Sequence, residues 1–379
     1  MDPKPKSTSG KLLSSLVLRP ISWAYGAVTA TRNKLFDIGV LTQREFDIPI
    51  LVIGNIAVGG TGKTPHTEYV LELLRHNYKI GMLSRGYNRH TKGFVMATDQ
   101  SDARSIGDEP YQIYQKFGKK GVTVAVCEDR CVGIDKMREL NPEINLIVLD
   151  DAFQHRYVKP TASVVLTEYS HPVFNDTMLP AGRLREGLGA LHRADIVVVT
   201  KCPSNMKQLE YRLFVKNLDL YPYQKLYFSQ YNYGDLVPVF PDDAPDPVPQ
   251  LSSLTNEDTI VALAGVANPR PFIHHLKTFG ARVKGLAFSD HHNFTLEDMA
   301  LVLKKIKSAT KPKRAIVVTT EKDAMRLRSL KGIPPWLRSR MFYIPVSVNF
   351  IPNVAEVNQA GSKEFAETLS QLLSGPKQL

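Results

Sequence analysis

The stretch that decides the fold is GNIAVGGTGKT, residues 54–64. It follows a short apolar run at residues 48–53 and precedes residues 64–74, which have the pattern of a helix. A glycine-rich loop between a strand and a helix lets backbone N–H groups turn toward phosphate oxygens. The final lysine and threonine supply a cation for the phosphates and a hydroxyl for Mg²⁺. The residues expected to bind a nucleotide are Gly59, Gly60, Thr61, Gly62, Lys63 and Thr64.

The loop is a variant of the strict phosphate-binding pattern. That pattern has a glycine five places before Gly62, and this chain has Ala57 there. Gly59 and Gly60 supply the flexibility instead. An ordinary glycine-rich turn would not need the Gly-Lys-Thr ending in this context, so we interpret the stretch as a phosphate-binding loop (P-loop).

The second half of such a site is a carboxylate at the end of a buried strand. The apolar run 144–149 ends in Asp150 and Asp151. One of these carboxylates is expected to meet Mg²⁺, directly or through water, and the sequence does not decide which. The alternative is that an aspartate caps the next turn.

Outward from these motifs, short apolar runs alternate with helical segments. The runs at 80–83, 122–126, 164–166 and 196–199 predict, with the two above, a doubly wound parallel α/β sheet of the P-loop NTPase type. A proline-rich stretch then predicts a linker, after which strands and helices resume. The expected organisation is an N-terminal helix at 1–38, a kinase-like core at 39–205, a linker at 206–257 and a smaller α/β domain at 258–379.

The N-terminal segment has the period of an amphipathic helix. Its apolar residues are Leu13, Leu16, Val17, Ile21, Ala24 and Val28. Trp23, Tyr25 and several basic residues fit a helix that lies in a membrane interface. Taken alone, the segment slightly favours the alternative of a terminal helix packed on the body. Arg19 and Pro20 interrupt it, so a membrane-spanning helix is not expected.

Composition narrows the class of protein without choosing a partner. The 379 residues carry a formal net charge of +11, which favours an anionic partner. No nucleic-acid recognition motif is present, so a nucleic acid is not expected. The three cysteines argue for a reducing compartment and against disulfides. No His or Cys near Cys127 and Cys131 completes a zinc set, so metal binding there is not expected.

Several further motifs come in a characteristic order. They are SRGY at 84–87, GDEP at 107–110, LDDAFQH at 149–155, LRE at 184–186, DHHNF at 290–294 and TEKD at 320–323. With the P-loop, this ordered set resembles the tetraacyldisaccharide 4′-kinase (lipid A 4′-kinase) family over nearly the whole chain. Ala152 departs from a common family glycine, and alanine is the smallest change available.

The resemblance implies a fold, a reaction and a place in the cell. It implies a P-loop core with a smaller α/β domain, and transfer of phosphate from ATP with Mg²⁺. The acceptor would be the 4′ position of a tetraacylated glucosamine disaccharide 1-phosphate, a lipid A precursor. It also implies a peripheral position at the cytoplasmic face of the bacterial inner membrane, with the N-terminal helix at the membrane surface. The oligomeric state stays open.

The resemblance also assigns roles that the residues alone do not. Glu186 matches a carboxylate of the metal site, and Arg185 would meet phosphate oxygens; the alternative is two solvated charges. Asp108 matches the proposed base, whereas the residues alone favour a helix cap. His291 matches the partner of that base, and its alternatives are metal binding or simple exposure. Lys63 completes the expected catalytic set.

Two other classes of protein, an ATPase switch and a GTP-binding protein, would share parts of this sequence pattern. A membrane-associated P-loop ATPase that switches conformation and phosphorylates nothing would also use this loop and an amphipathic helix, but would need no acceptor-side carboxylate. A GTP-binding protein would carry Asn-Lys-x-Asp or Thr-Lys-x-Asp. The stretch Thr200-Lys201-Cys202-Pro203 lacks the final Asp, so guanine recognition is not expected.

Overall fold

The computed structural model describes residues 8–290, 292–352 and 361–375. They form two compact units. Unit 1 comprises residues up to Arg85, Lys120–Tyr231 and Val348 onward, and unit 2 comprises Gly86–Lys119 and Asn232–Ser347. In both units, strands alternate with helices along the chain, as the sequence predicts for an α/β protein.

Unit 1 contains a mainly parallel sheet whose strands run in the order β14-β8-β7-β6-β1-β5-β2-β4. Apart from β8 and β14, its strands are almost wholly buried apolar runs, as expected for a parallel sheet covered on both faces. The strands are β1 (Ile50–Asn55), β2 (Ile80–Ser84), β4 (Thr123–Val126), β5 (Leu146–Asp150), β6 (Ala162–Glu168), β7 (Ile196–Thr200), β8 (Lys225–Tyr233) and β14 (Val346–Ile351). The helices are α1 (Thr8–Asp37), α2 (Lys63–Leu74), α5 (Arg130–Leu140), α6 (Gln208–Leu218) and α11 (Gly361–Ser374).

The register of unit 1 brings the functional loops to one edge. β1 lies between β5 and β6, and all three run in the same direction. Ile53 of β1 is opposite Asp150 of β5. Because parallel strands share one carboxyl edge, the loop after β1 and the Asp150–Asp151 pair after β5 leave the sheet side by side.

Unit 2 is built on a smaller sheet in the order β11-β10-β12-β13-β9. Its strands are β9 (Val237–Pro238), β10 (Thr259–Ala264), β11 (Arg282–Ala287), β12 (Ala315–Thr320) and β13 (Met341–Ile344), and β3 (Val95–Met96) lies in the same segment of chain as α3 and α4. Its helices are α3 (Ala103–Ile106), α4 (Asp108–Phe117), α7 (Arg270–Leu276), α8 (Leu296–Lys307), α9 (Glu321–Arg328) and α10 (Pro335–Arg338). The mainly parallel pairing and the smaller second sheet confirm the predicted fold class.

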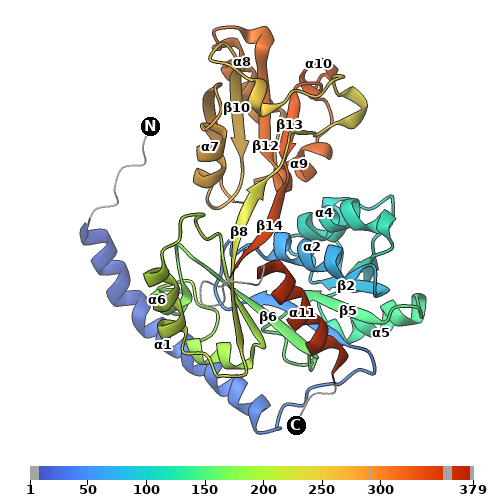
Figure 1. Cartoon of the computed structure of the whole chain (residues 1–379), viewed down its shortest axis with the longest axis vertical. Coiled ribbons are helices and arrows are strands. Elements are labelled where there is room, and N and C mark those ends of the chain that lie inside the picture. The colour runs from blue at the N-terminus through green and yellow to red at the C-terminus, as the bar shows by residue number, and fades with distance from the viewer. Residues whose placement is uncertain (1–7, 291, 353–360, 376–379) are drawn as a thin grey trace. The chain divides into compact units, whose positions relative to one another are not determined.

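The two units do not follow the predicted domain boundaries. Residues 86–119, expected in the core, group with the later segment, and the C-terminal helix α11 groups with unit 1. Residues 208–218 and 225–233, expected within a linker, form α6 and β8. The prolines explain the last error, because they cluster after residue 237 and leave the earlier part with Pro222 alone. β8 and β14 link the units and are neighbours in the sheet (Figure 1).

The N-terminal helix α1 is one continuous helix that passes through Pro20 (Figure 1). Its contacts to the body include the buried Phe36, whose ring lies edge-on to Tyr157 with the centroids 5.1 Å apart, and several polar residues. The Ser22 hydroxyl accepts a hydrogen bond from the Ala181 N–H at 3.0 Å, and the Asn33 amide donates to Glu186 at 3.1 Å. No helix in the described part of the chain is long and apolar enough to cross a bilayer.

Candidate active site

The P-loop takes a path that depends on two glycines. Gly59 has φ +108° and Gly62 has φ +91°, both in the left-handed region where a side chain is strained. A Cβ on Gly62 would also lie 2.3 Å from the Tyr231 hydroxyl. Gly62 precedes the first residue of α2, Lys63, so the helix N-terminus faces the space that the loop encloses.

Side chains from neighbouring strands hold the loop. The Asn55 amide donates to the Thr61 hydroxyl at 2.6 Å, and the Thr200 hydroxyl donates to the Thr61 carbonyl at 2.8 Å. Lys201 donates to the Gly60 carbonyl and pairs with Glu168 at 3.1 Å. These contacts preorganise the loop, because its backbone is fixed before any phosphate arrives.

The two aspartates after β5 have different surroundings. Asp150 is fully buried and accepts a hydrogen bond from the Thr67 hydroxyl of α2 at 2.8 Å. Asp151 has φ +49° and lies 3.6 Å from the Lys63 ammonium. Asp151 therefore lies next to the loop lysine. Carboxylate oxygens such as these, and the hydroxyl of Thr64, the second residue of α2, are the hard oxygen donors that suit Mg²⁺.

Of the Arg185–Glu186 pair, the structure brings only Arg185 to the aspartates. The Arg185 guanidinium donates to Asp151 at 3.1 Å. The backbone N–H of Arg185 donates to the Ile56 carbonyl at 2.7 Å. Glu186 is buried, and its two oxygens accept hydrogen bonds from Asn33 at 3.1 Å and Arg193 at 2.6 Å. Through its hydrogen bond with Asn33, Glu186 helps to hold α1 against the rest of unit 1.

Arg130, the first residue of α5, is a cation near the site that was not expected from the sequence. Its side chain is only 4% exposed, and one N–H donates to the Glu128 carbonyl at 2.8 Å. Burial and the nearby Arg85 lower its pKa, while Asp151 and Asp150 act in the opposite direction. Arg130 thus adds a cation near the aspartates. Arg130 follows the carboxyl end of β4 by four positions, and this place at the carboxyl edge of the sheet could have indicated a site residue.

Asp108 belongs to unit 2 and is the first residue of α4, with Gly107 as the N-cap. It is therefore not the cap that the residues alone favoured. Arg326 of α9 donates to Asp108 Oδ2 through Nε at 2.8 Å and through a terminal nitrogen at 2.6 Å. His291 lies outside the described residues. Its neighbour His292 is hydrogen-bonded to Asp298 at 2.8 Å.

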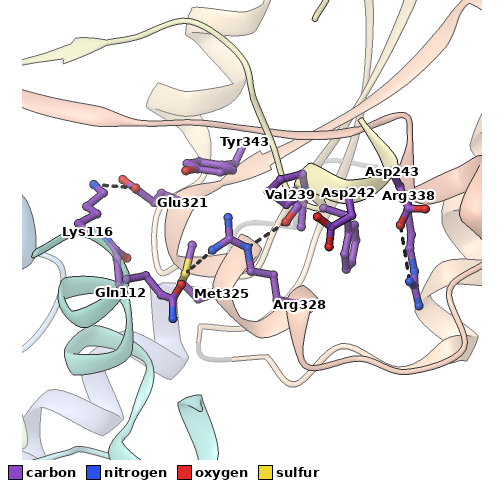
Figure 2. A pocket seen from close by; sticks show the side chains of 13 residues that line it. Gln112, Lys116, Val239, Asp242, Asp243, Glu321, Met325, Arg328, Arg338 and Tyr343 are labelled. Carbon is purple, nitrogen blue, oxygen red and sulfur yellow. Dashed lines mark hydrogen bonds and ion pairs between the residues drawn. The ribbon is translucent and has the colours of Figure 1, made fainter. Parts of the chain in front are cut away.

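Unit 2 also contains a cavity of about 490 Å³ that none of the predicted site residues lines (Figure 2). Its charged side chains largely pair with one another: Lys116 with Glu321 at 2.6 Å and Arg338 with Asp243 at 3.6 Å. Arg328 donates to the Val239 carbonyl at 2.9 Å. Because these charges are already matched, the cavity does not identify the chemistry of the protein.

A buried histidine supports the P-loop from within α2. His66 Nδ1 lies 2.8 Å from the Gly62 carbonyl, and Nε2 lies 2.9 Å from the Ser229 hydroxyl. Since a carbonyl can only accept, Nδ1 carries the proton and Nε2 accepts from Ser229 in the neutral ring. Burial lowers the pKa of His66 to about 4.

Together these features define a P-loop α/β protein with a lysine, two aspartates and added arginines at the carboxyl edge of its sheet. Comparison with known proteins makes the assignment specific. The sequence model of the family described as "Tetraacyldisaccharide-1-P 4′-kinase" (LpxK) matches residues 14–362, and the chain belongs to this family.

Relatives with that name cover most of the chain. The tetraacyldisaccharide 4′-kinase of Bacteroides thetaiotaomicron is 48% identical over 343 residues, 89% of each chain. That of Bacteroides fragilis strain YCH46 is 50% identical over 337 residues, again 89% of each. A crystal structure of LpxK from Aquifex aeolicus in complex with ATP matches with a TM-score of 0.69 and 24% identity, covering 96% of this chain and 99% of that one. The similarity to this crystal structure supports the α/β fold described above.

We predict that His66 makes stability depend on pH in the acid range. Unfolded chains take up a proton on histidine near pH 6.5, whereas native His66 does so only near pH 4. Acid therefore favours the unfolded state between these values, by up to about 3 kcal/mol at about 1.4 kcal/mol per pKa unit. Urea unfolding at pH 7, 5.5 and 4.5 should show a shallower loss for His66→Gln than for the wild type. Parallel losses would contradict this prediction.

Proposed function

We propose that this protein transfers the γ-phosphoryl group of ATP to the 4′-hydroxyl of a tetraacylated glucosamine disaccharide 1-phosphate in lipid A biosynthesis. Membership of the family supports the reaction and the acceptor. The observation that carries the proposal is the P-loop, where Lys63 and Arg185 both face Asp151 at the edge of the sheet.

The nucleotide side of the proposal assigns roles to residues that the structure brings together. The amides of Gly59–Lys63 and the Lys63 ammonium would bind the β- and γ-phosphates. Arg185 and Arg130 would face the charge that spreads over the transferred group. Thr64 with Asp150 or Asp151 would hold Mg²⁺, which would supply positive charge against the phosphates. Phosphoryl transfer needs mainly such positioning and charge neutralisation.

The acceptor side of the proposal assigns Asp108 as the base that takes or orients the proton of the sugar hydroxyl. Its carboxylate is held by two hydrogen bonds from Arg326, which itself is buried and also pairs with Asp323 at 2.9 Å. Such a clamp, with both hydrogen bonds made to Oδ2, fixes the orientation of the carboxylate. His291 remains the proposed partner of this base, and Glu186 the proposed additional metal ligand.

We also propose that α1 lies at the cytoplasmic surface of the inner membrane. The helix packs on the body through Ser22, Asn33 and Phe36, whereas three apolar residues on its described outer part stay exposed. Ile21 is 51% exposed, Trp23 75% and Val28 68%. A helix that merely packed on the body would bury this face. An exposed apolar face with an amphipathic aromatic residue instead suits the headgroup region.

The P-loop assignment predicts that Lys63→Ala abolishes transfer, because it removes the cation that faces the phosphates. We expect turnover to fall by at least about 100-fold, in the range seen when one charge-stabilising donor is removed. Transfer of label from radiolabelled ATP to tetraacyldisaccharide 1-phosphate in detergent micelles measures this loss. The matched control is Lys216→Ala, an exposed lysine of α6.

The same assay tests the kinase against the acceptor-free ATPase switch. A kinase gives labelled lipid, and its ATP consumption requires the acceptor. Hydrolysis that proceeds equally without acceptor, with no labelled lipid, would support the switch. Transfer by Lys63→Ala within about tenfold of the wild type, a loss of about 1.4 kcal/mol or less, would refute the role of the P-loop.

The acceptor assignment predicts that Asp108→Asn lowers kcat by about 10²–10⁴-fold, the usual cost of losing a general base. ATP affinity should stay nearly unchanged, because Asp108 has no part in binding the phosphates. Glu109→Gln is the matched control, since Glu109 is the next residue of α4 and pairs with Lys322 at 2.9 Å. Near-normal kcat in Asp108→Asn would move the search for the base to Asp150 and Asp151.

The proposed membrane face predicts that Ile21→Ser, Trp23→Ser and Val28→Ser together weaken sedimentation with anionic liposomes by at least about tenfold, because apolar area is lost. These substitutions leave the packed face of α1 intact. The control is Leu209→Ser with Leu213→Ser, which removes exposed apolar residues of α6. Equal binding by the triple variant and the wild type would show that α1 does not contact the membrane.

A further inference from the structure

Three side chains with metal-binding atoms, none of them assigned a role above, meet beside α5 and next to Arg130. Asp129 precedes α5, Cys131 lies in its first turn, and His155 follows the Asp150–Gln154 stretch. One carboxylate oxygen, the thiol sulfur and one ring nitrogen all lie within 4.8 Å of one another. In a tetrahedral zinc site, bonds of about 2.0–2.3 Å put donor atoms roughly 3.5 Å apart. Small side-chain shifts would therefore bring these three donors around one ion.

The Asp129 carboxylate is oriented by the backbone of α5. Its Oδ1 accepts hydrogen bonds from the N–H groups of Cys131 at 2.8 Å and Val132 at 3.3 Å. Bonds of this kind fix a carboxylate in metal sites and leave its other oxygen for the ion. Cys131 has only a weak contact from its thiol to the Tyr157 carbonyl, at 3.7 Å, which a metal would replace at little cost.

His155 is the ligand that points to an ion. Its Nε2 is shielded from solvent and has no hydrogen-bond partner in the described part of the chain. A buried polar atom without a partner costs free energy, and a metal bond would remove that cost.

The charges around the cluster decide the kind of metal. Arg130, Arg32 and Arg85 all face His155 and oppose a cation. A hard ion such as Mg²⁺ or Ca²⁺, which binds through charge and oxygen ligands, would be repelled. An ion that forms strong bonds to thiolate and imidazole is favoured instead, because two negative ligands neutralise its charge.

We propose that Asp129, Cys131 and His155 form a three-ligand site for Zn²⁺ or a similar borderline-soft divalent ion. Binding releases the proton of the Cys131 thiol, and water completes the fourth position. The sequence spacing concealed this site, since His155 lies 24 positions beyond Cys131 (155 minus 131). The proposal does not rest on the phosphoryl transfer proposed above, although the site adjoins Arg130.

The test uses Co²⁺ as a spectroscopic probe of the full-length protein, in thiol-free buffer with excess Mg²⁺ to fill the nucleotide site. We expect one equivalent of Co²⁺ to produce a near-ultraviolet thiolate-to-cobalt charge-transfer band that Zn²⁺ abolishes. Cys131→Ser should lose the band. His155→Gln should weaken Co²⁺ affinity by about tenfold or more, since even outer-shell partners cost that much.

Matched controls separate this site from general effects of thiols and charge. Cys202→Ser and Asp135→Asn, an exposed carboxylate on α5, should keep the band and the affinity. Where Cys131→Ser does not fold, protection of Cys131 by Zn²⁺ against alkylation in the wild type, read by mass spectrometry, replaces it. No band in the wild type, a band retained by Cys131→Ser, or alkylation of Cys131 unaffected by Zn²⁺ would each overturn the proposal.

Discussion

The left-handed backbone at Gly62 is the constraint on which unit 1 depends. With φ +91° it turns the chain from the loop into α2, and the absence of a side chain leaves room for the Tyr231 hydroxyl. Around this turn, β1 contributes Asn55, β7 leads into Thr200 and Lys201, and β8 contributes Ser229 behind His66. The order of the parallel strands matters because it brings all these side chains to one edge.

The charges at this edge are arranged before any nucleotide binds. Lys63, Arg185 and Arg130 surround the Asp150–Asp151 pair, so cations outnumber carboxylates locally. Such a balance suits a polyphosphate that brings its own cation. Asp151 lies between Lys63 and Arg185 and is partly exposed, so solvent weakens its attraction for both cations. Asp150 is buried and accepts a hydrogen bond from Thr67.

The features that could be predicted from the sequence are those that depend on residues close together in the chain. The P-loop, the aspartates after β5 and most strands of both sheets follow from local apolar runs and glycine positions. The grouping of 86–119 with unit 2 does not, because it rests on ion pairs such as Lys116–Glu321 and Asp108–Arg326, between residues more than 200 positions apart. The place of Arg130 and the contacts of Glu186 with Asn33 and Arg193 could not be predicted for the same reason, because they depend on the tertiary fold.

The N-terminal helix is connected to the nucleotide loop through a short series of hydrogen bonds. Arg32 donates to the Gln154 carbonyl at 3.1 Å, the Gln154 amide donates to the Asn55 carbonyl at 2.7 Å, and Asn55 holds Thr61. A truncation of this helix would therefore disturb the loop as well as any attachment to lipid. The proposed attachment to lipid is therefore better tested by changes on the outer face of the helix, which leave these hydrogen bonds in place, than by a truncation.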